Sequence, residues 1–548
     1  MKKAILPYLL VFTAVTAVFI SSRFVLFKSF HGTDDLHYAM LAAKMLKGTY
    51  DPFQPGDIFS GRIIVIAWQA FLYRIGGINV FMTSTGTVAA TVAACLITVT
   101  KLLPVRTPAT TLVACCLFYF SPPLTNDIPG ISPDPYILLV STCILLILKN
   151  DSQEKAPLHH SWLRAVVMGV LIAVTLLIKE TIIIFLPYSM LMIWLYHKKL
   201  NSLWVFVSSL AMVVLMGWGY HHFTGNAFFK FSQIENSAYP NPCNFSYLPL
   251  KDLLIRLTYG TWRAFTLLGF YPFVLGGIAL LAPFLSGKKI QWKKEYNLTS
   301  FILLLVLSLY LPFSWKSYQP LCAAPRHFYF LLPSAVILVT TTLHSLPDTR
   351  RSWSVVTLLS FVLLIVCFSG TSNKWQWMIY SMLFAYFAGL PVLKRLAGNY
   401  HYAAFCCILF ISILEPLFFN RTDWFANMRG ISKTIYTGYY YFPDHDNLMH
   451  WKLLHHFDDS TIHAYNIEKH PYKVYQVYYQ KMDSTRFHPG WLMVNKAYTT
   501  CSPVFLNRID SLQRTKYFSD YVIKGALGAF WINSKEQYEY IRSINFRK

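Results

Sequence analysis

The chain is dominated by long apolar runs that are separated by short basic segments. Of its 548 residues, 55% are apolar and only 13% are charged. Several runs approach or exceed the roughly 18 residues that a membrane-spanning helix needs. We therefore predict a polytopic α-helical membrane protein.

About thirteen spans are expected from these runs. The first run follows Met1-Lys2-Lys3, and no small-x-small cleavage site comes after it, so we interpret it as a retained span and not as a signal peptide. The expected spans lie near residues 4–27, 79–100, 108–121, 134–149, 164–178, 181–196, 202–220, 262–285, 298–313, 327–343, 353–369, 375–392 and 402–419.

The net charge of +23 is concentrated in the short loops between the apolar runs. Cytoplasmic loops are enriched in Lys and Arg, so this pattern indicates membrane orientation and not a nucleic-acid partner. The basic loops lie near 101–106, 149–164, 198–199, 288–294, 350–351 and 394–395. We expect a plasma (inner) membrane protein with a cytoplasmic N-terminus and, because the number of spans is odd, a periplasmic C-terminal segment.

The ten cysteines form no CxxC pair and no zinc-binding spacing. Most lie in apolar runs, where cysteine behaves as a small hydrophobic residue. Cys243, Cys322 and Cys501 lie in polar segments, and the sequence does not assign a disulfide to them.

The character of the chain changes near residue 420, where the apolar runs end. We predict a membrane domain over 1–419 and a small extracytoplasmic α/β domain over 420–548. Alternating stretches at 472–479 and 491–494 are typical of strands, and 522–532 predicts a buried strand or a turn followed by a strand. Helices are expected over 513–521 and 534–544.

The segment from His31 to Tyr50 follows the first apolar run and carries two adjacent carboxylates, Asp34 and Asp35. Acidic residues number only 25 in the chain, so a pair beside a span is a candidate site. At about 100° per residue, the segment predicts a helix on the membrane surface with the carboxylates at its edge. The alternative is a solvated loop with a capping aspartate. The expected apolar face holds Leu36, Ala39, Ala43 and Leu46, and the opposite face holds Asp34, His37, Tyr38 and Lys44.

Three further outer segments are expected. Residues 53–78 form a second interfacial stretch in which Arg62 and Arg74 flank an aromatic, apolar helix. Residues 221–261 and 314–326 are predicted to be outer loops.

A second acidic group lies in the segment 126–136, NDIPGISPDPY. Asp134 stands between two prolines at the start of an expected span, which restricts its freedom. Asp127 is the alternative acid in this segment, and a proline-rich turn with a capping aspartate is the structural alternative.

Two basic groups complete the set of candidates. Lys179 and Glu180 interrupt apolar sequence, where charges pair with each other or serve a site. Arg326 lies with His327 and Tyr329 at the outer end of a span, and arginine suits bidentate phosphate contacts. An arginine at a span end can also be a snorkelling anchor.

The order and spacing of these groups resemble the GT-C fold integral-membrane glycosyltransferases. The nearest branches are the protein O-mannosyltransferases, the aminoarabinose transferases of lipid A and the lipopolysaccharide core transferases. Residues 34–38, Asp-Asp-Leu-His-Tyr, match the family's acidic motif after its first span, and Gly48 to Pro52 roughly match its continuation. SPDPYILL with Asp134 matches the family's second acid.

Other motifs of the resemblance are basic. Arg62 and Gly76-Gly77 match an arginine and the end of the following helix, although Ile63 and Ile64 stand where the family has prolines. The lysine turn before a Leu-Pro and the basic-aromatic entry to a later span are also matched. These two motifs are Lys179 with Pro187, and Arg326, His327 and Tyr329 with Pro333. The matched motifs lie within about residues 1–345. Beyond them, only the architecture supports the resemblance.

The resemblance implies transfer of a sugar from a polyprenyl-phosphate-linked donor to an envelope acceptor at the outer face of the membrane. The acceptor is lipid A, a glycan or a protein hydroxyl. It implies Asp34 as catalytic base and Asp134 as the second catalytic carboxylate, with Asp35 and Tyr38 in support. Arg62, Lys179 and Arg326 would bind the donor phosphate. Asp34 and Asp134 could hold Mg²⁺ or Mn²⁺, and no other cofactor is expected.

Two other functions fit the same residue types. A transporter or flippase of a lipid-linked saccharide would use the cations for phosphate and the carboxylates for protons, but transport sites lie near the bilayer midplane. An O-antigen ligase or polymerase would carry its long outer loop late in the chain, whereas here the acidic loop comes first.

Overall fold

The computed structural model describes most of the chain. The described residues are 6–26, 33–54, 57–127, 130–153, 161–196, 199–236, 249–285, 295–312, 319–345, 350–371, 373–415, 424–435, 439–443, 445–457, 463–467, 487–495, 503–515, 517–524 and 527–544.

Two compact units make up the chain. The first, here called the helical unit, consists of Met1–Phe27, Thr87–Phe229 and Asn241–Phe419. The second, here called the mixed unit, consists of Lys28–Gly86, Lys230–Pro240 and Asn420–Lys548. The mixed unit therefore combines the acidic segment after the first apolar run with the C-terminal part of the chain.

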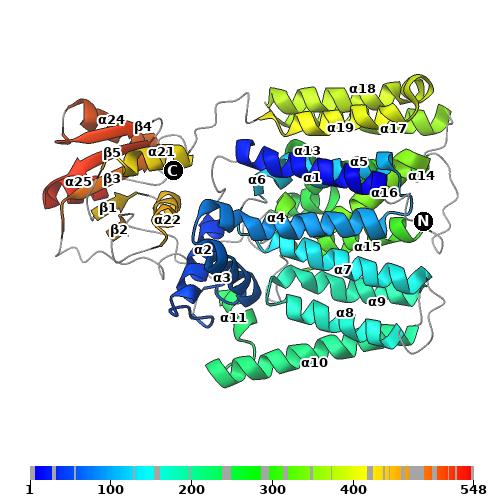
Figure 1. Ribbon diagram of the computed structural model, residues 1–548, viewed down its shortest axis with the longest axis horizontal. Coiled ribbons are helices and arrows are strands. Elements are labelled where there is room, and N and C mark those ends of the chain that lie inside the picture. The colour runs from blue at the N-terminus through cyan, green and yellow to red at the C-terminus, as the bar shows by residue number, and fades with distance from the viewer. Residues whose placement is uncertain are drawn as a thin grey trace. The chain divides into compact units, whose positions relative to one another are not determined.

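The helical unit is built from apolar helices that lie alongside one another (Figure 1). Its elements are α1 (Leu6–Leu26), η2 (Thr98–Leu102), α5 (Pro108–Tyr119), α6 (Pro122–Asp127), α7 (Asp134–Gln153), α8 (Ser161–Thr175), η4 (Glu180–Ile184), α9 (Phe185–Tyr196), α10 (Lys199–Thr224), α12 (Leu250–Ile255), η5 (Arg256–Gly260), α13 (Thr261–Leu267), α14 (Tyr271–Leu285), α15 (Tyr296–Tyr310), η6 (Pro325–Leu331), α16 (Leu332–Ser345), α17 (Arg350–Gly370), α18 (Lys374–Ala397), η7 (Gly398–Tyr400) and α19 (His401–Ser412). Helices α4 (Val80–Ile97) and α11 (Phe229–Asn236) contain residues of both units.

Among the described residues, five helices are long and apolar enough to cross a bilayer. They are Val80–Leu102, Asn201–Thr224, Pro325–Ser345, Ser352–Gly370 and Lys374–Leu396. Eight shorter apolar helices accompany them. The prediction of a polytopic α-helical membrane protein is confirmed, whereas the count of about thirteen spans stays a prediction.

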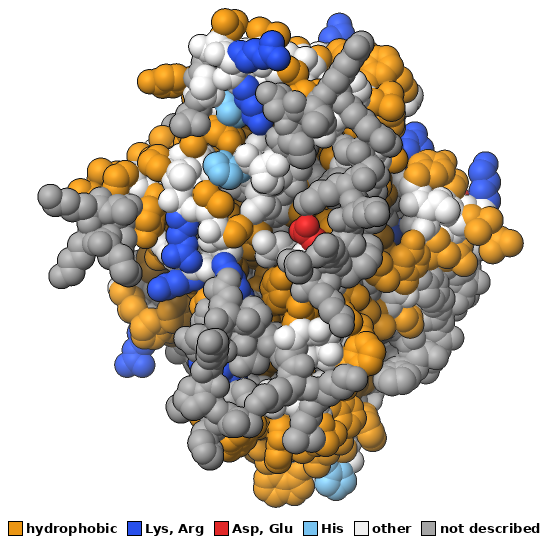
Figure 2. Space-filling view, turned by 90° about the vertical axis from the view of Figure 1, so that its right-hand side faces the viewer, with side chains coloured by type: hydrophobic (Ala, Val, Ile, Leu, Met, Phe, Trp, Pro, Cys, Tyr) orange, Lys and Arg blue, Asp and Glu red, His pale blue; other side chains and the backbone are white. Residues whose placement is uncertain are grey.

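One face of the protein illustrates the surface that such a chain presents. In Figure 2, Lys and Arg side chains are spread among apolar ones, and acidic side chains are scarce among those drawn in colour. A mixture of apolar and basic side chains is typical of helix ends at a membrane surface, where Lys and Arg reach toward the head groups.

The mixed unit contains a five-stranded sheet with helices on both faces. Its elements are α2 (Thr33–Leu46), α3 (Ile63–Gly76), α21 (Trp424–Ser432), β1 (Tyr439–Phe442), α22 (His445–Leu454), β2 (His463–Asn466), β3 (Gly490–Asn495), α24 (Pro503–Arg514), β4 (Tyr521–Lys524), β5 (Leu527–Ile532) and α25 (Lys535–Ser543). The strand order is β2-β1-β3-β5-β4. Strand β1 pairs in parallel with β2 and β3, and β5 pairs antiparallel with β3 and β4.

Alternation along the central strand β3 explains the two helical layers. Leu492 and Val494 belong to the core that α24 and α25 cover, and Trp491 and Met493 belong to the core with residues of α21 and α22. All residues of β3 are buried, as a strand covered on both faces requires. The predicted small α/β domain is present as this sheet and its helices.

Details of the C-terminal prediction differ from the structure. The stretch 522–532 forms the hairpin of β4 and β5, and the helix expected over 534–544 is α25. The helix expected over 513–521 is wrong, because Phe505, Ile509 and Leu512 repeat every three to four residues and place α24 upstream. The stretch 472–479 lies outside the described residues.

The expected outer loop over 221–261 is also wrong in part. Helix α10 extends to Thr224, and α11, α12 and η5 follow within this segment. Short polar helices lack the long apolar period on which the span prediction relied.

Candidate functional site

The candidate acids Asp34 and Asp35 lie in the first turn of α2. The predicted helix is confirmed, and the alternative of a solvated loop is wrong, because Asp35 through Ala43 are all buried. Helix α3 and helix α22 both pack against α2. His37 and Tyr38, expected on the polar face, are 0% and 1% exposed.

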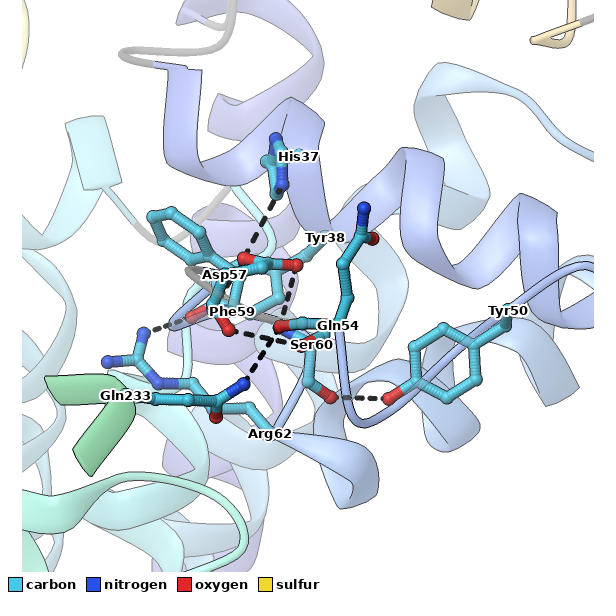
Figure 3. A network of polar contacts seen from close by, with 9 residues as sticks. All are labelled: His37, Tyr38, Tyr50, Gln54, Asp57, Phe59, Ser60, Arg62 and Gln233. Carbon is cyan, nitrogen blue, oxygen red and sulfur yellow. Dashed lines mark hydrogen bonds and ion pairs between the residues drawn. The ribbon is translucent and has the colours of Figure 1, made fainter. Parts of the chain in front are cut away.

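A turn around Asp57 lies next to α2 in the mixed unit (Figure 3). Its carboxylate accepts hydrogen bonds from the backbone N–H groups of Phe59, at 2.8 Å, and Ser60, at 3.1 Å. The Ser60 hydroxyl donates to the Asp57 carbonyl at 3.1 Å. This local pattern is the one by which aspartate stabilises a turn.

Arg62 connects this turn to α2. Its guanidinium donates a hydrogen bond to the Tyr38 hydroxyl and lies 5.9 Å from the centre of the Tyr38 ring and 5.7 Å from that of Phe59. Both distances are within the range of cation–π attraction. The Tyr38 and Phe59 rings pack edge to face at 5.4 Å.

A second layer of contacts fixes the turn from outside. The Gln233 side chain, on α11, donates to the Gln54 carbonyl at 2.9 Å, and Figure 3 shows it beside the turn. The ammonium group of Lys230 donates to the Gly61 carbonyl at 3.2 Å. Tyr50 donates to the Ser60 carbonyl at 2.5 Å. The turn is therefore held by segments far apart in the sequence.

Burial sets the protonation of this network. Desolvation raises the pKa of Asp57 from 3.8 to about 6, and the backbone hydrogen bonds from Phe59 and Ser60 and the charge of Arg62 counteract only part of this effect. The imidazole of His37 lies 4.0 Å from the Asp57 carboxylate, and both side chains are fully buried. Asp57 is thus a carboxyl group that changes its charge near neutral pH.

A separate polar group forms in the helical unit around Asp134, at the start of α7. The Asp134 carboxylate accepts a hydrogen bond from the Ser132 hydroxyl at 2.8 Å. It also forms an ion pair with the Lys179 ammonium at 2.5 Å. Asp134 is 4% exposed and Lys179 is 6% exposed. Lys179 lies in extended backbone just before η4, where the helical path is interrupted between α8 and α9.

The turn η6 brings two further candidates to Asp134. Nδ1 of His327 lies 3.0 Å from the Lys179 ammonium, and Arg326 is close enough for its positive charge to stabilise the Asp134 carboxylate. The buried Tyr329 anchors the turn by donating to the Pro123 carbonyl at 2.9 Å. We call Asp134, Lys179, Arg326 and His327 the Asp134 cluster.

The Asp134 cluster combines the basic side chains of a lysine, an arginine and a histidine with one carboxylate. Such an arrangement can bind an anion, because charge-assisted hydrogen bonds from Lys and Arg suit phosphate oxygens. Its components come from chain segments at 134, 179 and 326–327, so the fold builds the cluster. No group of three or more His, Cys, Asp or Glu side chains among the described residues is arranged to hold a metal ion.

The structure brings some of the predicted site residues into contact and leaves others apart. Asp134, Lys179 and Arg326 meet in the helical unit. Tyr38 and Arg62 meet in the mixed unit, where Asp34 and Asp35 also lie. The side chain of Asp127 lies outside the described residues.

Several participants were not predicted from the sequence. Asp57 lies in the expected interfacial stretch 53–78 but was not among the candidate residues, although its spacing to Ser60 is typical of an aspartate turn. His37 was expected on the face of the helix opposite the apolar one, and no partner was predicted for it. Gln233 gave no signal, since an isolated glutamine in a polar segment is common and its contact lies 179 residues away.

Comparison with solved structures shows the fold. The chain is similar to ArnT from Cupriavidus metallidurans bound to undecaprenyl phosphate, with 13% identity, a TM-score of 0.56 and coverage of 96% of this chain and 98% of that one. The apo state of the same protein matches with 13% identity, a TM-score of 0.54 and coverage of 95% and 98%. The oligosaccharyltransferase of Archaeoglobus fulgidus, in a complex with Zn and sulfate, has 12% identity, a TM-score of 0.42 and coverage of 81% and 61%. No protein-family model and no curated protein matches the sequence.

The chain therefore has the GT-C fold of ArnT along nearly its whole length. The fold predicted from the order of the acidic and basic motifs is confirmed.

Proposed function

We propose that this protein transfers a sugar from a polyprenyl-phosphate-linked donor to a hydroxyl group of an envelope acceptor. The observation that carries this proposal is the full-length similarity to ArnT, whose solved structure contains undecaprenyl phosphate. The acidic helix α2 and the Asp134 cluster supply the residue types that such a reaction needs.

The Asp134 cluster is the proposed site for the donor phosphate. Lys179 and Arg326 would stabilise the negative charge that develops on the departing phosphate, as fixed cations do in other phosphoryl-binding sites. Asp134 holds Lys179 in place through the 2.5 Å ion pair, which supports its role as second carboxylate. Arg62 is a further candidate for the phosphate, although its guanidinium here contacts Tyr38.

Asp34 is the proposed base. It would accept the proton of the acceptor hydroxyl while that oxygen attacks the anomeric carbon of the donor. The bond between the anomeric carbon and the phosphate oxygen breaks, and the polyprenyl phosphate leaves with the bonding electron pair. Asp35 and Tyr38, on the same helix, would support Asp34.

The decisive experiment replaces the base. Asp34→Asn removes the proton acceptor, and transfer in membranes supplied with a defined polyprenyl-phosphate sugar and acceptor should fall by about 10²- to 10⁴-fold. Asp51→Asn is the matched control, because Asp51 is an exposed aspartate of the same unit that accepts a hydrogen bond from the Phe53 N–H, and it should retain activity. Full transfer by Asp34→Asn would overturn the assignment.

The competing function as a flippase has a distinct outcome. If the parent protein transferred no sugar but moved the lipid-linked saccharide across the bilayer, and Asp34→Asn abolished that movement, the flippase interpretation would be correct.

Donor binding is tested separately. Arg326→Ala should raise the KM for the donor by roughly ten- to more than a hundredfold, since a charged hydrogen bond contributes about 1.5–3 kcal/mol. An unchanged KM would identify Arg326 as a membrane-interface anchor.

We further propose that the C-terminal domain, residues 420–548, is extracytoplasmic and that the N-terminus is cytoplasmic. The basic inner loops support this orientation. Cys322, in the predicted outer segment before η6, is disulfide-bonded, and disulfides persist in oxidising compartments such as the periplasm. Reporter fusions near residues 290 and 460 should report opposite sides of the membrane, and the same side for both would contradict the proposal.

A further inference from the structure

A groove of about 760 Å³ lies between α17 and α18 in the helical unit. These helices pack side by side (Figure 1). The groove is separate from the Asp134 cluster, with which it shares no residue. Its lining residues are Trp353, Ser354, Thr357, Leu358, Phe361, Phe384, Ala388, Pro391 and Arg395.

A proline helps to form the groove. Pro391 lies inside α18 and has no N–H to donate to the Phe387 carbonyl one turn earlier. The Thr357 hydroxyl of α17 donates to that carbonyl at 3.5 Å instead. The helices are thus tied together at the level where the regular hydrogen bonding of α18 is interrupted.

One end of the groove is basic and the other is apolar. Arg395 lines the basic end, and the neighbouring Lys394 lies 4.8 Å above the Trp353 ring. Tryptophan with Lys or Arg is typical of the membrane–water interface. Leu358 and Phe361 line the other part and are 60% and 44% exposed. Among the residues that the structure describes, no acidic side chain lines the groove.

The length of the groove matches one leaflet. Arg395 lies eleven positions after Phe384 in α18, which corresponds to about 16.5 Å at a rise of about 1.5 Å per residue. Half of a hydrocarbon core of about 30 Å is about 15 Å. A lipid with its head group at Arg395 would therefore have its acyl chain along Leu358, Phe361 and Phe384.

We propose that this groove binds one anionic phospholipid of the leaflet on the side of Lys394 and Arg395. The phosphate contacts the Arg395 guanidinium, and an acyl chain occupies the aromatic part between the two helices. Basic pockets between membrane helices are suited to anionic head groups. The combination of a basic end and one-leaflet depth selects a phospholipid over a purely apolar occupant.

The experiment measures phospholipid retained by the full-length protein. Protein purified in detergent is titrated with phosphatidylglycerol or with phosphatidylcholine, and bound lipid is counted by native mass spectrometry. Phosphatidylglycerol should bind in preference to phosphatidylcholine. Arg395→Gln should weaken phosphatidylglycerol binding by about fivefold, which corresponds to the roughly 1 kcal/mol that one basic side chain contributes beside an anionic lipid. Arg263→Gln, at an exposed arginine of α13 outside the groove, should not.

A second pair of variants tests the acyl part. Ala388→Trp fills the groove and should abolish retention of the lipid. Ala385→Trp, at an exposed position of the same helix that does not line the groove, should leave it unchanged. Equal retention by all variants would mean non-specific annular lipid and would overturn the proposal. Binding of polyprenyl phosphate in preference to phosphatidylglycerol, lost in Arg395→Gln, would also overturn it.

Discussion

Asp134 and Asp57 are both buried carboxylates, but the protein surrounds them in opposite ways. Asp134, in the helical unit, forms an ion pair with Lys179, which lies 45 residues further along the chain. Asp57, in the mixed unit, is held by the backbone amides of the second and third residues after it. Its imidazole neighbour, His37, is 4.0 Å away.

These different surroundings determine what each carboxylate can do. A carboxylate paired with a buried ammonium stays charged and fixes the position of its partner, which is useful next to an anionic ligand. A carboxyl group that accepts hydrogen bonds from neutral backbone donors and is desolvated by burial has a raised pKa and serves to shape a turn. The Asp134 cluster is thus organised by charge across the fold, and the Asp57 network by local backbone geometry.

The largest expected effect comes from breaking the ion pair. Lys179→Met leaves the Asp134 carboxylate buried without its ammonium partner, and the free energy of unfolding should fall by about 3–5 kcal/mol. Thermal unfolding of the purified protein in detergent measures this change. The double variant with Asp134→Asn should recover much of the loss, because no buried charge is then left unpaired. A Lys179→Met variant as stable as the parent would show that the pair adds nothing to stability.

The second effect is a pH dependence of stability that we expect from Asp57. The folded state keeps the proton of Asp57 up to about pH 6, whereas the unfolded state loses it near the ordinary pKa of 3.8. The stabilisation is therefore fully present below about pH 4 and is lost as the pH rises through 6. The difference between the two pKa values corresponds to about 3 kcal/mol.

Comparison with Asp57→Asn isolates this contribution from other titrating groups. The difference in unfolding free energy between parent and variant, followed by denaturant titration from pH 4 to pH 7, should shift by about 3 kcal/mol. Parallel pH profiles for the two proteins would contradict the raised pKa.

A smaller effect is expected where the Asp57 turn meets α2. Tyr38→Phe removes the hydroxyl that accepts from Arg62, and loss of a hydrogen bond to a charged group costs about 1.5–3 kcal/mol. Denaturant unfolding of Tyr521→Phe is the control, since Tyr521 is 51% exposed on β4. Equal stability of the two variants would indicate that Arg62 is held by ring stacking alone.

The smallest effect concerns the outer contacts of the turn. Gln233→Leu removes the hydrogen bond to the Gln54 carbonyl and should lower the unfolding free energy by about 0.5–1.5 kcal/mol. Gln513→Leu, at a partly exposed position of α24, should change it by less than about 0.5 kcal/mol. A loss in Gln233→Leu as large as that of Tyr38→Phe would mean that α11 and not Arg62 fixes the turn.

The fold and the individual members of the Asp134 cluster could be predicted from the sequence for the same physical reason. Apolar runs long enough to span a bilayer leave few other structures. Charged residues such as Lys179 and Asp134 stand out in an apolar background, because burying a charge is costly unless it is paired. Their spacing along the chain matched known motifs, so both became candidate site residues, whereas their direct ion pair was not predicted.

The Asp57 network could not be predicted in the same way. The period of α2 separates an apolar from a polar face, but it does not reveal that α22 covers α2 as well, because that helix lies about 400 residues later in the chain. Gln233 and Lys230 contact the turn through backbone carbonyls, which any side chain with an N–H group can reach. Such contacts leave no distinctive pattern in the residues.

The long-range contacts of α2 can form only late in the synthesis of the chain. The Lys47 ammonium donates to the Phe457 carbonyl at 2.7 Å across 410 residues, and His456 lies 2.6 Å from the Ile78 carbonyl. At about 5–20 residues per second, a ribosome needs roughly 20–80 s to add the residues between Lys47 and Phe457. During that time the helix with Asp34 exists without α22, so this part of the molecule is completed only after α22 has been synthesised.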